Sequence, residues 1–319
     1  MLHAVVPPKS AELSQAPTRI VLGAYLRGLR TYRGETLDDA ARIVRQSASA
    51  VSRWERAESP APQAAVRALL RRYGIARQHA DFLVRSLPQQ HYVRSRGGER
   101  GCATRVPFDY WGDAAGTEAL ARYIAVMRMA SEIIEFTPAI PAGLRTQAYQ
   151  KVLQNPAFLL RADEPVLGLP PWVHGMPWAT GQHRTVLLDE AVLRRPVGGP
   201  QVMAQQLRHL VGLMEGEESD SSGLVIRIVP MGAFLFVHTV SWPAEVTLHG
   251  HRMVTSFGAF PSYAVESPIA RTVRAGLREA LSRACGREET YELIERAAAA
   301  MERRAAVRSV LHSSSPTRD

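Results

Sequence analysis

The pattern that most limits how this chain can fold is a pair of short helices separated by a tight turn near the N-terminus. Thr36 and Asp39 have the spacing of a capping box, which predicts a helix over residues 37–44. Ser47 is the expected N-cap of a second short helix, which ends at Glu55. Two such helices form a helix-turn-helix, whose second helix can enter the major groove of DNA.

The second helix is expected to have a packed face and an exposed face. Val51 and Trp54 fall on the packed face, where they can contact the first helix. The guanidinium of an exposed arginine can form two hydrogen bonds with guanine, and an alanine methyl can contact the methyl of thymine. We therefore expect DNA contacts from the first N-cap, the turn and the exposed face of the second helix: Thr36, Arg45, Gln46, Ser47, Ala48, Ser49, Ser52 and Arg53.

The net charge of the chain is consistent with a polyanionic partner. The formal net charge is +9 over 319 residues, and almost all of the positive charge is arginine, because lysine occurs only at Lys9 and Lys151. Cationic side chains gain affinity for DNA by releasing counterions from its phosphates. A basic surface that faces only solvent is the alternative. No apolar stretch is long enough to span a membrane. We therefore expect a cytoplasmic, nucleoid-associated protein.

No catalytic or metal-binding motif stands out. Cys102 and Cys285 lack the spacing of a zinc site, and we expect neither a disulfide nor a metal role for them. His238, His249 and His251 would be the members of an acid/base or metal cluster, but no carboxylate stands at ligand spacing. We expect no enzymatic activity, no cofactor and no metal ion.

The chain is expected to hold two folded domains. A mainly helical N-terminal domain is followed by an α+β domain with a small, largely antiparallel sheet. The expected divisions are a flexible arm (1–18), the helix-turn-helix domain (19–88), a glycine- and arginine-rich hinge (89–112), a regulatory and dimerisation domain (113–307) and a flexible tail (308–319).

The second half of the chain mixes helical and strand patterns. An amphipathic helix is expected from Thr117, with an apolar stripe that reaches Ile134. Apolar strand patterns predict a strand within 223–230, another within 234–240 and one or two more within 245–257. A helix is expected to begin at Ser267 and Pro268. His249 and His251 are expected on one face of a strand.

The segment AARIVRQSASAVSRWERAESPAP (40–62) resembles the XRE or lambda-repressor-like helix-turn-helix. The resemblance implies a structural ion pair between Arg30 and Glu55. It places Ala48, Ser49 and Arg53 at the base edges and Ser47 and Ser52 near phosphates or the groove wall. It also implies a homodimer on a pseudo-palindromic operator in double-stranded DNA.

Two departures from the family pattern concern DNA contact. Arg45 stands where the family usually has glycine, so we expect a strained or altered turn. The loop after Glu55 contains Glu58 and little positive charge beyond Arg56, so phosphate contacts must come from elsewhere. The candidates for those contacts are Arg27, Arg33, Arg71, Arg72, Arg94, Arg96 and Arg100.

The second half resembles the companion domain of WhiJ-like XRE regulators of actinobacteria, a domain of unknown function described as antitoxin-like. The segments that carry the resemblance are EFTPAIPAGLRTQAYQKVL (135–153), VLLDEAVLRRPVGGPQVMAQQLRHLVGLME (186–215) and VIRIVPMGA (225–233). The resemblance implies a transcriptional regulator, a repressor in our interpretation, and a small protein partner encoded nearby.

Aromatic residues in proline-containing loops form a second candidate site. Trp172, His174, Trp178 and Trp242 are predicted to line a ligand pocket or a partner surface, although tryptophans also simply fill cores. Two functions remain open. The chain is a dimeric DNA-binding regulator that receives a signal from a ligand or protein, or it is an antitoxin-like module that neutralises a neighbouring protein, with DNA binding secondary.

Overall fold

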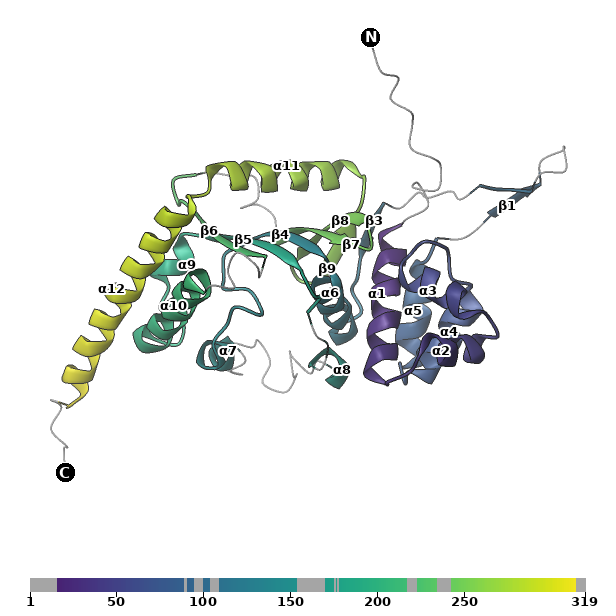
Figure 1. The fold of residues 1–319 in the computed structure, drawn as a ribbon, viewed down its shortest axis with the longest axis horizontal. Coiled ribbons are helices and arrows are strands. Elements are labelled where there is room, and N and C mark those ends of the chain that lie inside the picture. The colour runs from purple at the N-terminus through teal and green to yellow at the C-terminus, as the bar shows by residue number, and fades with distance from the viewer. Residues whose placement is uncertain are drawn as a thin grey trace, which may run out of the picture. The chain divides into compact units, whose positions relative to one another are not determined.

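The computed structural model of the chain (Figure 1) describes residues 16–88, 91–94, 100–103, 109–153, 170–174, 176, 178–216, 223–233 and 242–313. The chain divides into two compact units, each of which combines segments that are distant in sequence. The first unit consists of Met1–Ser131, Leu169–Ala179 and Val246–Thr272. The second consists of Glu132–Gly168, Thr180–Glu245 and Val273–Asp319.

Helices dominate the N-terminal region and recur throughout the rest of the chain. The N-terminal helices are α1 (Pro17–Tyr32), α2 (Leu37–Val44), α3 (Ala48–Glu55), α4 (Gln63–Arg72) and α5 (Arg77–Ser86). The later helices are α6 (Thr117–Met129), α7 (Gln147–Leu153), α8 (Pro171–His174), α9 (Ala191–Arg194), α10 (Pro200–Glu215), α11 (Pro268–Arg283) and α12 (Arg287–Ser313).

Within the described ranges, the strands form two sheets. An antiparallel ribbon consists of β1 (His91–Arg94) and β2 (Arg100–Ala103). The larger sheet has seven strands in the order β3-β9-β8-β7-β4-β5-β6. Their bounds are β3 (Tyr110–Gly112), β4 (Glu132–Thr137), β5 (His183–Asp189), β6 (Leu224–Val229), β7 (Pro243–Leu248), β8 (His251–Phe257) and β9 (Pro261–Ala264).

The expected fold class, a helical helix-turn-helix region followed by an α+β region, is confirmed. The sheet, expected to be largely antiparallel, is mixed: β3, β9 and β8 are antiparallel neighbours, whereas β4, β5 and β6 run parallel. The parallel part was not predicted, because short apolar runs such as those of β4 do not distinguish a buried strand from a helix.

Two local expectations are corrected. The apolar stripe from Thr117 does not reach Ile134, because α6 ends at Met129 and Ile134 lies on β4. The strand expected at 234–240 lies outside the described residues. His249 lies in the turn before β8 with φ 50°, so it does not share a strand with His251.

The first unit is built around α1. Twelve of the sixteen residues of α1 are buried. On one side α1 packs against α3, and on others it contacts α6 and α8. Tyr25 of α1 meets Trp172 of α8 edge to face, with ring centroids 5.5 Å apart. The helix-turn-helix region and later segments of the chain therefore share one hydrophobic core.

A buried ionic group supports α1 from the side of α6. The Arg122 guanidinium donates two 2.7 Å hydrogen bonds to Asp113, and both side chains are fully buried. Arg122 also stacks over the Tyr25 ring, 5.2 Å from its centroid, and the Tyr25 hydroxyl donates to Glu118. Because removal of one partner would leave a buried charge unpaired, this group fixes how α1 and α6 pack.

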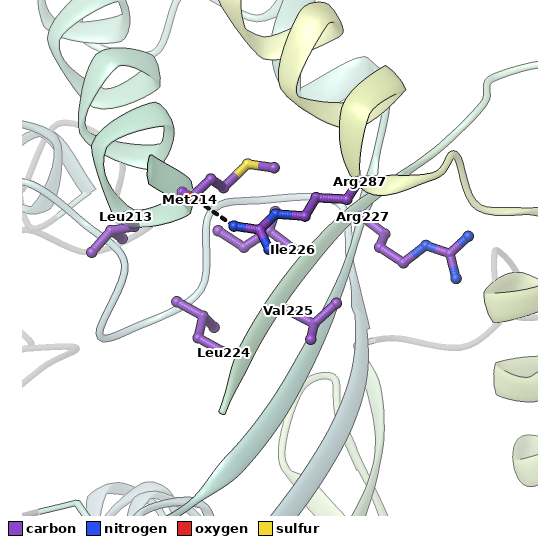
Figure 2. A pocket seen from close by; sticks show the side chains of 7 residues that line it. All are labelled: Leu213, Met214, Leu224, Val225, Ile226, Arg227 and Arg287. Carbon is purple, nitrogen blue, oxygen red and sulfur yellow. Dashed lines mark hydrogen bonds between the residues drawn. The ribbon is translucent and has the colours of Figure 1, made fainter. Parts of the chain in front are cut away.

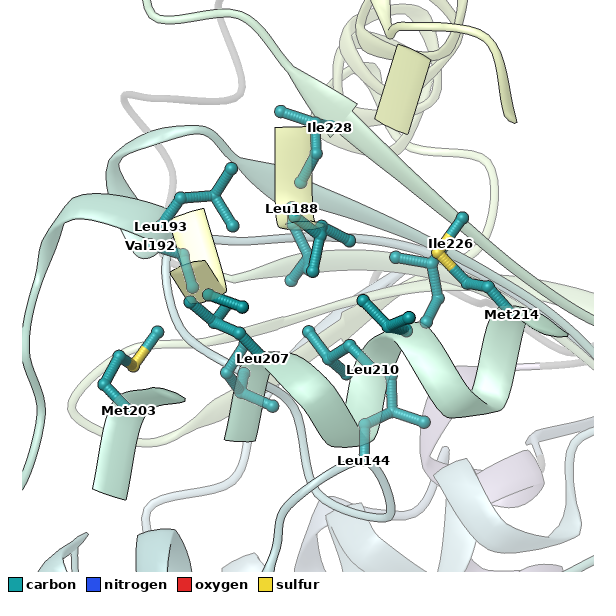
Figure 3. Packing of buried hydrophobic residues seen from close by; sticks show 14 of the residues in the cluster. Leu144, Leu188, Val192, Leu193, Met203, Leu207, Leu210, Met214, Ile226 and Ile228 are labelled. Carbon is teal, nitrogen blue, oxygen red and sulfur yellow. The ribbon is translucent and has the colours of Figure 1, made fainter. Parts of the chain in front are cut away.

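The second unit has its core between the parallel strands and α10. In Figure 3, Leu207, Leu210 and Met214 of α10 lie with Leu188 of β5 and Ile226 of β6 in one apolar cluster. Helix α12 adds Ile294 and Met301 to the same cluster. The spacing of the α10 residues is that of a helix with one buried stripe, which explains why α10 packs against this face.

Candidate nucleic-acid interface

Local hydrogen bonds fix the first helix and its turn. The Thr36 hydroxyl accepts a bond from the Asp39 amide (3.2 Å), while the Asp39 carboxylate accepts one from the Thr36 amide (2.8 Å). This is the capping box that the spacing predicts. Helix α2 ends at Arg45, whose φ of 54° and ψ of 48° lie in the left-handed region. Arg45 thus takes a conformation in which glycine carries no side-chain penalty.

The second helix has its own cap and a distinct exposed face. The Ser47 hydroxyl accepts a bond from the Ala50 amide at 3.2 Å and lies 3.0 Å from the Ser49 hydroxyl. Ala48 and Ser52 are half-buried. The exposed members of the predicted DNA-contacting set are Thr36, Arg45, Gln46, Ser47, Ser49 and Arg53.

An ion pair joins α1 to the end of α3. Arg30 Nε donates to Glu55 Oε1 at 2.7 Å, and a second guanidinium nitrogen donates to Oε2 at 2.9 Å. Arg30 also donates to the Glu35 carbonyl at 2.8 Å, and Glu55 is only 4% exposed. The bond to Glu55 raises the pKa of Arg30. The pair holds α3 at a fixed position against α1.

Close backbone contact reinforces this position. A methyl group placed on Gly23 of α1 would lie 2.4 Å from the Glu55 carbonyl oxygen. Only glycine leaves room for α3 at that distance. The exposed face of α3 is therefore presented by a helix whose inner side is tightly held.

The two charged side chains of the loop after α3, Arg56 and Glu58, form an ion pair. Arg56 donates to the Ser52 hydroxyl at 2.7 Å and makes two bonds to Glu58, at 2.6 and 2.9 Å. The Arg56 guanidinium lowers the pKa of Glu58. Ser52 of α3 is thus occupied by a contact with Arg56, four residues later, which sequence reasoning did not predict.

The other candidate phosphate-binding arginines differ in their contacts within the protein. Arg72 pairs with Glu35, and Arg33 donates to the Tyr73 carbonyl at 2.9 Å. Arg27 and Arg71 are exposed. The side chains of Arg94 and Arg100 and all of Arg96 lie outside the described residues.

The residues of the predicted aromatic site are distributed over both compact units. Trp172 is 4% exposed and packs on Tyr25, and Trp178 lies under the Arg128 guanidinium at 5.7 Å. Trp242 is 39% exposed, with φ 38°, and belongs to the second unit. The His174 side chain lies outside the described residues. Trp172 is thus part of a packed core, a role that the sequence also allowed.

A small hollow lies in the second unit, beside the edge strand β6. Its volume is about 100 Å³, and Figure 2 shows its lining side chains: Leu213, Met214, Leu224, Val225, Ile226, Arg227 and Arg287. Arg287 donates to the Met214 carbonyl at 2.8 Å, and Arg227 donates to the Cys285 carbonyl at 2.7 Å. Ligand pockets commonly have about 300–1,000 Å³, so the hollow does not resemble a small-molecule site.

The part of the chain that the structure describes lacks two further features. No three His, Cys, Asp or Glu side chains there are grouped as metal ligands. No helix there is both long enough and apolar enough to cross a membrane.

Comparison with known families divides the chain in two. Residues 21–83 match a family described as a helix-turn-helix domain, and residues 120–296 match a domain of unknown function, DUF5753. The first match contains α2, α3 and most of α1, which are the elements that form the candidate interface. No curated protein and no solved structure gives a match.

Proposed function

Because the chain belongs to the DUF5753 family and carries a helix-turn-helix domain before that region, we propose that it is a sequence-specific DNA-binding transcriptional regulator. The observation that supports this most is the geometry of α3. Its inner side is fixed by Glu55 and Gly23, and its outer side exposes Ser49 and Arg53. A rigid helix with an exposed polar face is suited to the major groove.

Roles within the interface follow from exposure and chemistry. Arg53 is proposed to read guanine and Ser49 to contact a base edge, because both are exposed on α3. Arg45, Gln46, Ser47 and the Thr36 end of α2 are proposed to contact phosphates or the groove wall. Ala48 is half-buried and is proposed to make an apolar contact with a thymine methyl.

The proposal extends to assembly and regulation. One helix-turn-helix reads only a few base pairs, so a homodimer on two half-sites is proposed. Repression, a signal received from a small protein or ligand, and action at the nucleoid belong to the same proposal. No enzymatic activity is assigned.

A selection from random duplex DNA with the full chain tests this function. The expected result is one enriched, pseudo-palindromic sequence. Arg53→Ala should reduce discrimination at one base pair per half-site by about 1–3 kcal/mol, whereas Arg303→Ala, on the exposed surface of α12, should change nothing. Binding can be measured by fluorescence anisotropy.

Two results would contradict the proposal. If no sequence is enriched, the chain does not read DNA specifically, and the antitoxin-like alternative gains support if a small protein co-purifies. If Arg53→Ala discriminates between sequences as well as the unaltered chain does, α3 is not the reading helix.

A further inference from the structure

A turn from the DUF5753 region contacts the helix-turn-helix within the first unit. The turn joins β7 to β8 and contains His249 and Gly250, with φ 50° and 82°. Two adjacent residues with positive φ form the tight turn that suits an antiparallel hairpin. Leu248 and Met253 beside the turn are buried, at 1% and 0% exposure. The position of the hairpin tip is therefore fixed by packing.

Two hydrogen bonds connect this tip to the DNA-binding helices. His251 Nε2 lies 2.9 Å from the Arg56 carbonyl oxygen, which follows α3 directly. A carbonyl oxygen can only accept, so His251 Nε2 carries the hydrogen. Arg27 of α1 donates to His249 Nε2 at 3.4 Å, so this nitrogen accepts and the His249 hydrogen is on Nδ1.

Positive charge is concentrated where these elements meet. Arg27 is exposed, and no carboxylate of the described residues forms an ion pair with it. Burial and then the charges of Arg27, His251 and Arg56 lower the pKa of His249. Glu58 opposes this charge, with Arg56 as its hydrogen-bonded partner.

Glu58 also shows where the hairpin lies relative to α3. The charges that lower the pKa of Glu58 include those of His251 on the hairpin and Arg53 on the exposed face of α3. Both groups are therefore near the same carboxylate. The hairpin tip lies beside the end of the recognition helix that carries its exposed arginine.

We propose that Arg27, Arg56 and the His249–His251 turn form a phosphate-binding site that holds the DNA backbone next to the bases contacted by α3. This inference rests on the proposed function. Its ligand is a phosphodiester group of duplex DNA, which accepts hydrogen bonds from Arg27 and from His249 Nδ1. A DNA phosphate replaces Glu58 as the partner of Arg56.

The site has a consequence for the two matched families. The turn lies in the DUF5753 match, whereas Arg27 and Arg56 lie in the helix-turn-helix match. The later region thus contributes directly to DNA affinity through the His249–His251 turn, next to the contact that Arg56 makes from the loop after α3.

The test measures salt-dependent binding of the full chain to the selected operator and to an unrelated duplex. Arg27→Ala should weaken binding to both duplexes alike and reduce the slope of log affinity against log salt by about 1. His249→Asn should weaken binding to both duplexes, because asparagine keeps the left-handed turn conformation but lacks the ring. Glu58→Gln should strengthen binding to both. Arg303→Ala is the matched arginine control.

Thermal melts of each variant show whether the fold is intact. Because Arg27 is exposed, Arg27→Ala is the variant least expected to lower the stability of the fold. An unchanged salt slope in Arg27→Ala, together with an unchanged affinity in His249→Asn, would overturn the phosphate site, even if Arg53→Ala loses specificity as proposed. If the unaltered chain shows no salt-sensitive DNA binding, the phosphate site and the proposed function both fail.

Discussion

Arg45 holds an unusual backbone conformation at the turn between α2 and α3. A non-glycine residue in the left-handed region costs about 1–2 kcal/mol, and Arg45 has φ 54° there. Its exposed side chain has no packing role that would offset this cost. The absence of glycine from the turn predicted a strained or altered turn. In the structure, the positive φ of Arg45 is the strained torsion angle.

Arg45→Gly should therefore stabilise the chain by about 1 kcal/mol. Denaturant unfolding, followed by circular dichroism, measures the change as a shift of the midpoint. Arg278→Gly, at an exposed position in the interior of α11, is the control and should destabilise by about 1 kcal/mol. Equal effects of the two substitutions would show that the Arg45 conformation carries no strain.

The Glu55 carboxylate is the buried partner of the Arg30 guanidinium in the helix-turn-helix. Glu55→Ala leaves Arg30 without its carboxylate and should destabilise by about 3–5 kcal/mol. Glu58→Ala, which removes an exposed partner of Arg56, should have a small effect. Thermal melts of both variants check this, and a nearly unchanged melt for Glu55→Ala would mean that the ion pair does not hold α3.

At the level of elements, the contact between α1 and α3 depends on a missing side chain. Gly23→Ala would place a methyl group 2.4 Å from the Glu55 carbonyl. Relief of this clash requires the helices to move apart, so we expect a loss of at least about 1–3 kcal/mol and weaker DNA binding.

Gly212 provides a matched control. It lies in α10, and a methyl group there would meet nothing within 4 Å. Gly212→Ala should stabilise by up to about 1 kcal/mol, since only helix propensity changes. If both substitutions stabilise in denaturant unfolding, the close approach of α1 and α3 is not a constraint on the fold.

The elements that could be predicted are those with local signals. The caps at Thr36 and Ser47 and the stripe of α10 specify helices through neighbouring residues alone. Strands β3 and β9 are too short to show alternation. The contact of His251 with Arg56 joins residues 195 positions apart, so no local pattern reveals it. The exposed face of α3 could thus be predicted, but the groups beside it could not.

At the scale of the molecule, the matched families do not coincide with the compact units. The first unit contains both the helix-turn-helix and parts of the DUF5753 match, namely 120–131, 169–179 and 246–272. Tyr25 is the clearest case, because it contacts Trp172 and lies beneath Arg122. Burial and the Glu118 carboxylate raise the pKa of Tyr25, as expected for a hydroxyl enclosed by this packing.

A fragment of residues 16–88 should therefore be less stable than the same residues in the full chain. The fragment exposes Tyr25 and the side of α1 that packs on α6 and α8. Hydrogen exchange of the α1 amides measures the difference directly, and we expect faster exchange in the fragment. Equal protection in both would mean that the helix-turn-helix folds independently of the later segments.

The burial of α1 along most of its length has a consequence for how such proteins can diversify. A helix-turn-helix whose first helix is covered on one side only can be transferred between proteins as an independent domain. Here a transplanted helix would have to reproduce Gly23 toward α3 and also Tyr25 and Gly28 toward the partners from the later segments. New DNA specificities in this lineage are therefore expected to arise by substitution on the exposed face of α3 rather than by recombination of whole DNA-binding domains.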